Sequence, residues 1–165
     1  MLEQINKIRS NPRSYISKLK KAEDCLQQDK NGNVYYPGKL KVVLYRGKQT
    51  FEDIISSLDK MKSMKPLIYK KDLCIKISNN KLDFNNGTYL KRKVNELINS
   101  GVKIKTFWKD NINDPDFNLL LMIINDNPLR KVVKIKDVLN PELKYIGINS
   151  GMLDQYFVCY IVLSD

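Results

Sequence analysis

Residues 144–163 read KYIGINSGMLDQYFVCYIVL, and this stretch decides the class of fold. Residues 144–148 and 156–163 are rich in β-branched and aromatic side chains, which is typical of strands. Between them, Asn149-Ser150-Gly151 predicts a turn, so we expect the chain to end in a hairpin-like pair of strands. Helical patterns precede this pair, and helices followed by strands predict an α+β class.

The upstream segments carry the apolar spacing of amphipathic helices. They predict helices over residues 2–21 in two pieces divided at Pro12, over 50–64, from 71 onward, over 94–98 with a glycine cap at Gly101, and from Asp114-Pro115 to residue 124. Residues 102–108 alternate between apolar and polar side chains and predict an edge strand. No linker or repeat divides the 165 residues, so we expect residues 1–165 to form one domain.

The chain is strongly basic, with a net charge of +11. Such a charge favours polyanionic partners, among them acidic proteins and nucleic acid. The basic residues are 24 lysines and only 5 arginines. Because base-reading and bidentate phosphate sites rely on arginine, the composition favours an acidic protein surface over nucleic acid. The alternative is that the lysines only solvate the surface.

Histidine is absent, and the cysteines are few. Cys25, Cys74 and Cys159 lie far apart without metal-binding spacing, which predicts free thiols. Cys74 and Cys159 stand in apolar stretches and are expected to be buried, whereas Cys25 is expected to be accessible. No apolar run is long enough to span a membrane, and the first residues lack a secretory signal. We therefore expect an intracellular, cytoplasmic protein.

Several short motifs follow one another along the chain. They are Asn6-x-x-Arg9 with Asn11-Pro12, residues 65–69 with Leu73, residues 110–112, residues 123–127, residues 137–141 with 145–148, and residues 157–161. In order and spacing these motifs resemble the CAP superfamily, also called SCP-like domains. The resemblance covers nearly the whole chain and implies a three-layer α-β-α sandwich.

The resemblance also implies a cleft that departs from the family pattern. The family's central cleft usually holds two histidines and two acidic residues and can bind a divalent metal. The first histidine falls at Asn79 or Asn80, the second falls at Val133 or Lys134, and the glutamate of the family's Glu-Asn-Ile motif is matched by Asp110. Valine cannot bind a metal, and a lysine ammonium repels one. We therefore expect a degenerate cleft at Asn80, Asp110 and Lys134, without metal, cofactor or catalysis.

Other catalytic arrangements have little support. A Ser-His-Asp or Cys-His pair is excluded without histidine. A Cys-Lys or Ser-Lys pair is conceivable but has no local signature in the sequence. Paired carboxylates could come from Asp110, Asp114, Asp116 and Asp126. A helix cap explains Asp114 and a turn explains Asp126 more simply.

These features together predict a non-catalytic structural or interaction component of a larger assembly. Its partner would present an acidic surface, such as the tubulin of ciliary or other cytoskeletal microtubules. The alternatives are a CAP module that binds a lipid or another small ligand, and a nucleic-acid-associated accessory protein such as a ribosomal one. Contacts with the partner are expected at Lys91, Arg92, Lys93, Lys103, Lys105, Lys109, Arg130 and Lys131.

Overall fold

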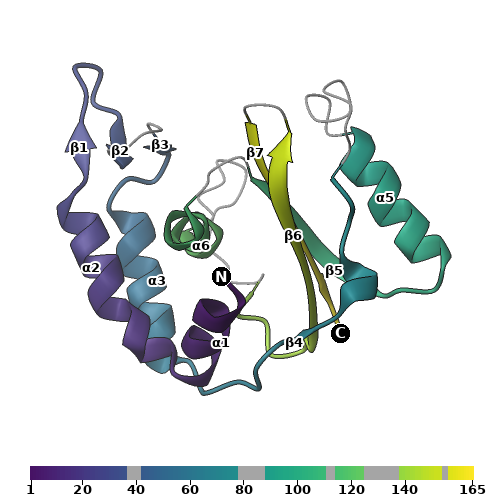
Figure 1. Cartoon of the computed structure of the whole chain (residues 1–165). Coiled ribbons are helices and arrows are strands. Elements are labelled where there is room, and N and C mark those ends of the chain that lie inside the picture. Colours follow the sequence, from purple (N-terminus) through teal and green to yellow (C-terminus); the bar gives the residue numbers. More distant parts are fainter. Residues whose placement is uncertain (37–41, 78–87, 111–113, 125–137, 154–155) are drawn as a thin grey trace.

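A four-stranded sheet forms the centre of the molecule (Figure 1). A computed structural model describes residues 1–36, 42–77, 88–110, 114–124, 138–153 and 156–165. The sheet has the order β4-β6-β7-β5, formed by β4 (Ile68–Tyr69), β6 (Tyr145–Leu153), β7 (Tyr156–Ser164) and β5 (Ile104–Asp110). β7 pairs antiparallel with both of its neighbours, and β4 pairs parallel with β6.

The side chains of β7 alternate between two hydrophobic cores. Cys159, Ile161 and Leu163 belong to one cluster of buried residues, whereas Val158, Tyr160 and Val162 belong to the other. Because successive side chains of a strand point to opposite faces, this pattern means that both faces of the sheet are covered.

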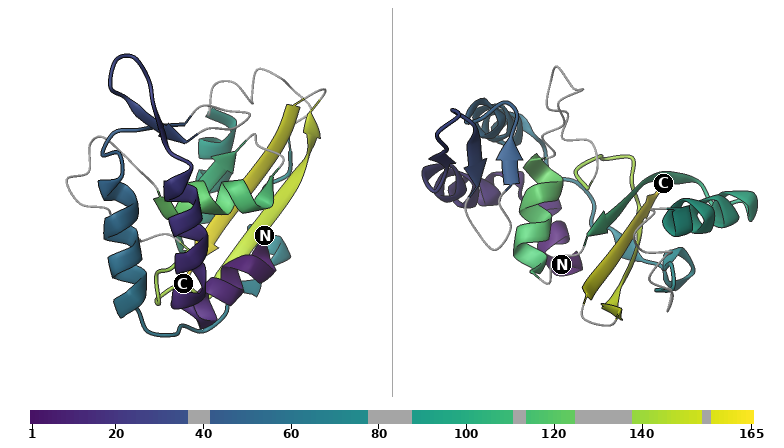
Figure 2. Two further views of the ribbon diagram at one scale, coloured as in Figure 1. Left: turned by 90° about the vertical axis from the view of Figure 1, so that its left-hand side faces the viewer. Right: turned by 90° about the horizontal axis from the view of Figure 1, so that it is seen from above.

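Helices cover both faces (Figure 1). One face carries α5 (Thr88–Asn99) and the single turn η2 (Lys71–Leu73). The other face carries α1 (Leu2–Ser10) and α6 (Pro115–Ile124), with η1 (Pro12–Tyr15), α2 (Ile16–Asp24) and α3 (Gln49–Lys60) farther out. The right-hand view of Figure 2 shows the same order of layers from above. The chain is thus α+β, as its sequence predicts.

A second, smaller sheet lies at the end of α2 and the beginning of α3 (Figure 1). Its antiparallel strands are β1 (Gln27–Gln28), β2 (Val34–Tyr36) and β3 (Val42–Leu44). Tyr36 of β2 stacks on Phe117 of α6, with ring centroids 5.5 Å apart. This contact joins the small sheet to the helices of the main core.

Two predicted helices end earlier than their sequence pattern indicates. α3 stops at Lys60 rather than at residue 64, and Met61 is already extended. The N–H of Met64 donates a 2.7 Å hydrogen bond to the carbonyl oxygen of Arg9, so a tertiary contact replaces the last helical turn. The helix expected from residue 71 is only the turn η2.

The predicted turn at Asn149-Ser150-Gly151 is wrong. β6 continues through these residues, which pair with Tyr160, Cys159 and Val158 of β7. Asn149 also donates from Nδ2 to the carbonyl oxygen of Ile75 at 3.0 Å, so its side chain is used in a tertiary contact rather than in a turn. The edge position of the predicted strand at 102–108 is confirmed by β5, and the glycine cap by the φ of +89° at Gly101.

Gly147 allows η2 to approach the sheet closely. A Cβ atom at this position would lie 2.4 Å from the carbonyl carbon of Leu73, much closer than two such atoms can come. Only glycine therefore fits where η2 crosses β6. The three cysteines are thiols that form no disulfide, with Cys25 exposed and Cys159 buried as predicted, but Cys74 is only half-buried.

Candidate functional site

Asn6 and Arg9 of α1 connect the first helix to distant segments of the chain. The fully buried guanidinium of Arg9 donates four hydrogen bonds to backbone carbonyl oxygens, at 2.8 Å to Lys65, 2.7 Å to Val138, 2.9 Å to Asn140 and 3.0 Å to Leu143. Burial lowers the pKa of Arg9 from its usual value. Since arginine stays charged even so, this group is a structural cation.

Asn6 lies one turn before Arg9 and fixes the same neighbouring segment. Its Nδ2 donates to the carbonyl oxygen of Leu67 at 3.0 Å, and its Oδ1 accepts from the N–H of Leu67 at 2.7 Å. Asn6 and Arg9 thus clamp residues 65–67 against α1. Both side chains therefore have a structural role.

The segment so clamped carries a dense group of exposed lysines. Residues 60–71 read KMKSMKPLIYKK, and we call them the lysine strap; all five of its lysines are exposed, namely Lys60, Lys62, Lys65, Lys70 and Lys71. The strap itself contains no acidic residue. The ion pairs found in the described part of the chain involve none of these lysines.

The end of the strap combines charge with exposed apolar surface. Ile68 and Tyr69 of β4 are large apolar side chains that are 59% and 50% exposed. The Nζ atom of Lys70 lies 3.6 Å from the centre of the Tyr145 ring, so one lysine also packs on an aromatic face. Exposed lysines and exposed apolar side chains thus lie next to one another in the strap.

The sequence prediction did not include the strap, although its five lysines in twelve residues are visible in the sequence. The pattern extended α3 to residue 64, which would place Lys60 and Lys62 on a helix. The extended backbone after Lys60 instead spreads the lysines along the outside of the molecule.

The predicted contact residues on α5 are partly neutralised. Arg92 and Lys93 share the carboxylate of Glu96, at 3.9 Å and 2.6 Å. Both cations also lie over the ring of Tyr89. Lys91, which follows Tyr89 and Leu90, is exposed and has no ion pair among the described residues. The α5 group therefore offers less free charge than the strap.

The remaining predicted contacts are separated from those on α5 or lie outside the described residues. Lys103 is exposed and follows the C-terminal end of α5, whereas Lys91 to Lys93 lie near its beginning. Lys105 and Lys109 lie on the backbone of β5. Two further contacts, Arg130 and Lys131, lie outside the described residues, as do the predicted cleft positions Asn80 and Lys134.

Asp110, the third predicted cleft position, lies at the end of β5. Its backbone is in register with Cys159, which in turn pairs with Ser150. Cys159 and Ser150 line an open groove of about 320 Å³. The other residues that line this groove are Met1, Leu2, Tyr69, Pro115, Asn118, Ile148 and Phe157. Within the described ranges, no three cysteine or acidic side chains converge as a metal site would require.

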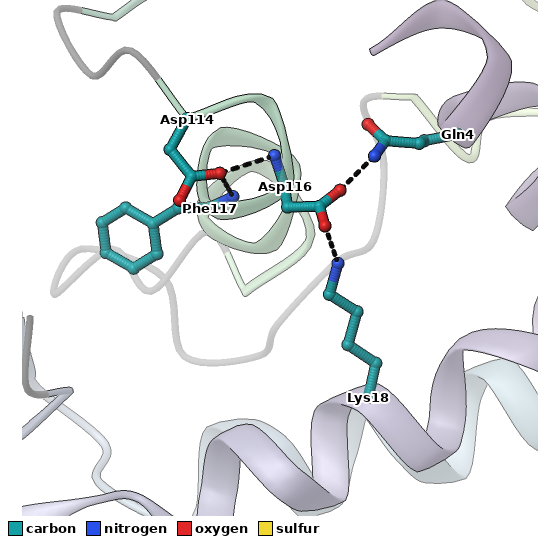
Figure 3. A network of polar contacts seen from close by, with 5 residues as sticks. All are labelled: Gln4, Lys18, Asp114, Asp116 and Phe117. Carbon is teal, nitrogen blue, oxygen red and sulfur yellow. Dashed lines mark hydrogen bonds and ion pairs between the residues drawn. The ribbon is translucent and has the colours of Figure 1, made fainter.

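Two of the candidate carboxylates have structural roles (Figure 3). Asp114 caps α6, since its Oδ1 accepts from the N–H groups of Asp116 and Phe117 at 3.0 Å each, as predicted. Asp116 pairs with Lys18 at 3.0 Å and accepts a hydrogen bond from Gln4. Asp116 therefore joins α6 to α1 and α2.

Comparisons with protein-family models, curated proteins and solved structures found no match. Across the described ranges, no helix has both the length and the apolar character that crossing a lipid bilayer would need.

Proposed function

We propose that this chain is a non-catalytic, CAP-like interaction component that binds an acidic protein surface through the lysine strap. The observation that carries the proposal is the group of five exposed lysines, none of which has an ion pair among the described residues. Unpaired cations attract a polyanion more strongly than cations that an adjacent carboxylate already neutralises.

The clamp formed by Asn6 and Arg9 supports this proposal. Five hydrogen bonds from these two side chains end on backbone carbonyl oxygens of Lys65, Leu67, Val138, Asn140 and Leu143. Such a clamp holds the middle of the strap in one conformation. A pre-ordered charged surface loses less conformational entropy on binding than a flexible tail does.

The CAP-like character of the domain belongs to the same proposal. The Asn-x-x-Arg motif that resembles the CAP superfamily hydrogen-bonds to two other segments that carry the resemblance, residues 65–69 and 137–141. The role of these motifs in binding the segments together supports a shared fold. The proposal places no catalysis in the degenerate cleft.

A microtubule lattice is the acidic surface that we propose for the partner, in the setting of a cytoplasmic or ciliary cytoskeleton. Co-sedimentation of the chain with microtubules and with a structured RNA, at low and at high salt, tests the proposal. We expect salt-sensitive binding to microtubules and weaker binding to RNA, because lysines serve diffuse attraction better than phosphate recognition. If the chain binds neither microtubules nor RNA, the proposal is contradicted.

A second candidate function rests on the groove beside β6. With a volume of about 320 Å³ and apolar lining residues such as Leu2, Ile148 and Phe157, it falls at the small end of ligand-binding sites. This favours a small apolar ligand over a large lipid. Mass spectrometry of the purified protein under native conditions would detect such a ligand, and its absence from protein purified from several sources would contradict this candidate.

A further inference from the structure

β6 has an edge that is only partly paired. β7 pairs with β6 along its whole length, from Tyr145 to Leu153. β4 pairs with the other side of β6 only at Tyr145 and Ile146. In the part of the chain that the structure describes, no strand continues this pairing along residues 147–153. An open edge of this kind presents backbone donors and acceptors to another extended segment.

The pairing with β4 shows which residues face this edge. The N–H groups of Ile68 and Lys70 donate to the carbonyl oxygens of Lys144 at 2.8 Å and Ile146 at 2.9 Å. Backbone N–H and C=O groups alternate in direction along a strand. The backbone groups of the even-numbered residues Ile148, Ser150 and Met152 therefore point to the side of β6 on which β4 lies, beyond the point where β4 ends at Tyr69. The Sγ atom of Cys74 lies 3.5 Å from the carbonyl oxygen of Ile148, whereas Ser150 and Met152 are exposed.

Apolar side chains lie beside these open backbone groups. Met152 is 59% exposed and Tyr69 is 50% exposed. The groove lined by Tyr69, Ile148 and Phe157 adjoins the same edge. In an added strand every second side chain points to one face, so an alternating apolar segment would place its side chains against this surface.

Positively charged side chains lie just after the end of β4. Lys70 and Lys71 follow Tyr69 directly, and Lys76 is exposed on the segment that leads away from η2. Asp72 is the single acidic residue among residues 60–77. A segment that paired with β6 beyond the end of β4 would therefore have Lys70 and Lys71 next to one of its ends. This favours carboxylates at that end of the segment.

We infer that the open edge of β6 binds an extended peptide segment of the partner by strand addition, and that this segment has acidic residues at the end nearest β4 and alternating apolar residues beyond them. The inference rests on the proposed function, because it names the form in which an acidic partner reaches the lysine strap. The lysines supply attraction and orientation, and the backbone of Ser150 and Met152 supplies the register.

A designed peptide tests this inference without altering the protein. The probe is a fluorescently labelled Glu-Asp-Val-Thr-Val-Thr-Val-Thr peptide, and the measurement is fluorescence anisotropy with the full chain. Two analogues carry backbone N-methyl groups, one at the valines and one at the threonines. Because only one set of N–H groups can face β6, we expect one analogue to bind at least about tenfold more weakly and the other to bind like the parent peptide.

Changes in the protein provide a second measurement. We expect the parent peptide to slow hydrogen exchange at the amides of Ser150 and Met152, and Ser150→Pro to weaken its binding by about tenfold. Proline is tolerated at a strand position whose N–H has no hydrogen-bond partner within its own sheet. If Ser150→Pro does not fold, the two N-methylated peptides still test the inference.

The outcomes separate this inference from the proposed function. Equal binding of both N-methylated analogues, or no binding of the parent peptide by a chain that still binds microtubules through its lysines, would overturn strand addition and leave the proposed function standing. If the chain binds neither the peptide nor microtubules, both proposals fail. Selective loss with one analogue, together with protection of Ser150 and Met152, supports strand addition.

Discussion

The guanidinium of Arg9 donates a 2.7 Å hydrogen bond to the carbonyl oxygen of Val138, 129 residues farther along the chain. The same side chain holds Lys65 in the strap and Leu143 just before β6. One buried cation thus connects the first helix, the strap and the final pair of strands. Although Arg9 lies near the N-terminus, we expect its side chain to make a large contribution to the stability of the whole fold.

Replacing Arg9 should therefore be severely destabilising. In Arg9→Met, four backbone carbonyl oxygens lose their donor, and we expect a loss of about 3–5 kcal/mol in the free energy of unfolding, measured by urea denaturation. Arg13→Met is the matched control, because Arg13 is exposed and pairs with Asp59 at 3.2 Å on the surface. It should change stability by less than about 1 kcal/mol. Equal losses in the two variants would contradict the clamp.

The contact between Gly147 and η2 provides a second prediction. Gly147→Ala would bring Cβ to 2.4 Å from the backbone of Leu73, so the strand or the turn must move, at a cost of about 2–3 kcal/mol. Gly151→Ala is the control in the same strand. Its Cβ would lie 3.0 Å from the flexible Cδ1 of Ile77, and the cost should stay below about 1 kcal/mol. Thermal denaturation distinguishes the two, and a Gly147 variant as stable as the control would show that η2 adjusts freely.

The hydroxyl group of Tyr15 is buried without a hydrogen-bond partner in the described structure. Tyr15→Phe should therefore leave the free energy of unfolding unchanged or raise it by about 1 kcal/mol at neutral pH. Burial, followed by the nearby charge of Asp116, raises the pKa of Tyr15 above its ordinary value of 10.0.

The raised pKa of Tyr15 also determines the dependence on pH. Above pH 10 the unfolded chain loses the phenolic proton while the folded chain retains it, so the wild-type protein should lose stability as pH rises. The difference between Tyr15→Phe and the wild type should accordingly widen between about pH 9 and pH 11. Denaturation curves over this range, with Tyr15→Leu as a packing control, check the sign. A constant difference would refute it.

The cap of α6 makes a smaller contribution. Asp114→Ala removes the acceptor of the N–H groups of Asp116 and Phe117 and should cost about 1 kcal/mol, measured by thermal denaturation. Asp114→Ser keeps a capping oxygen and should recover most of this loss. If serine is no better than alanine at this position, the carboxylate acts through something other than capping.

Local patterns in the sequence predict those elements whose boundaries depend on neighbouring residues. Asp114-Pro115 indicates the beginning of α6, Gly101 marks the end of α5, and the alternation of residues 102–108 indicates an edge strand. Each of these signals is a cap, a turn or a period that acts within a few residues.

The features that the sequence does not predict depend on distant partners. α3 ends at Lys60 because Met64 hydrogen-bonds to Arg9, which lies 55 residues earlier in the sequence. β6 continues through Asn149-Ser150-Gly151 because β7 pairs with it, although these three residues are typical of turns. The extended strap, and with it the candidate interaction surface, follows from the same kind of contact. Of the predicted cleft, only Asp110 lies within the described residues, so its degenerate character stays a prediction.

The lysine strap is tested by two variants of equal net charge. Lys60→Gln, Lys62→Gln, Lys65→Gln and Lys71→Gln together remove four strap charges. Lys20→Gln, Lys21→Gln, Lys48→Gln and Lys91→Gln together remove four exposed charges elsewhere, so that both variants fall from +11 to +7. Urea denaturation should show that the two variants are equally stable, because none of these lysines is in an ion pair among the described residues.

The decisive measurement is the affinity of the wild type and these two variants for microtubules, at low and at high salt. We predict that the strap variant binds at least about tenfold more weakly than the wild type at low salt and loses most of the salt dependence, whereas the control variant stays within about threefold of the wild type. Equal weakening in both variants would mean that net charge alone drives binding, and it would contradict a binding surface at the strap.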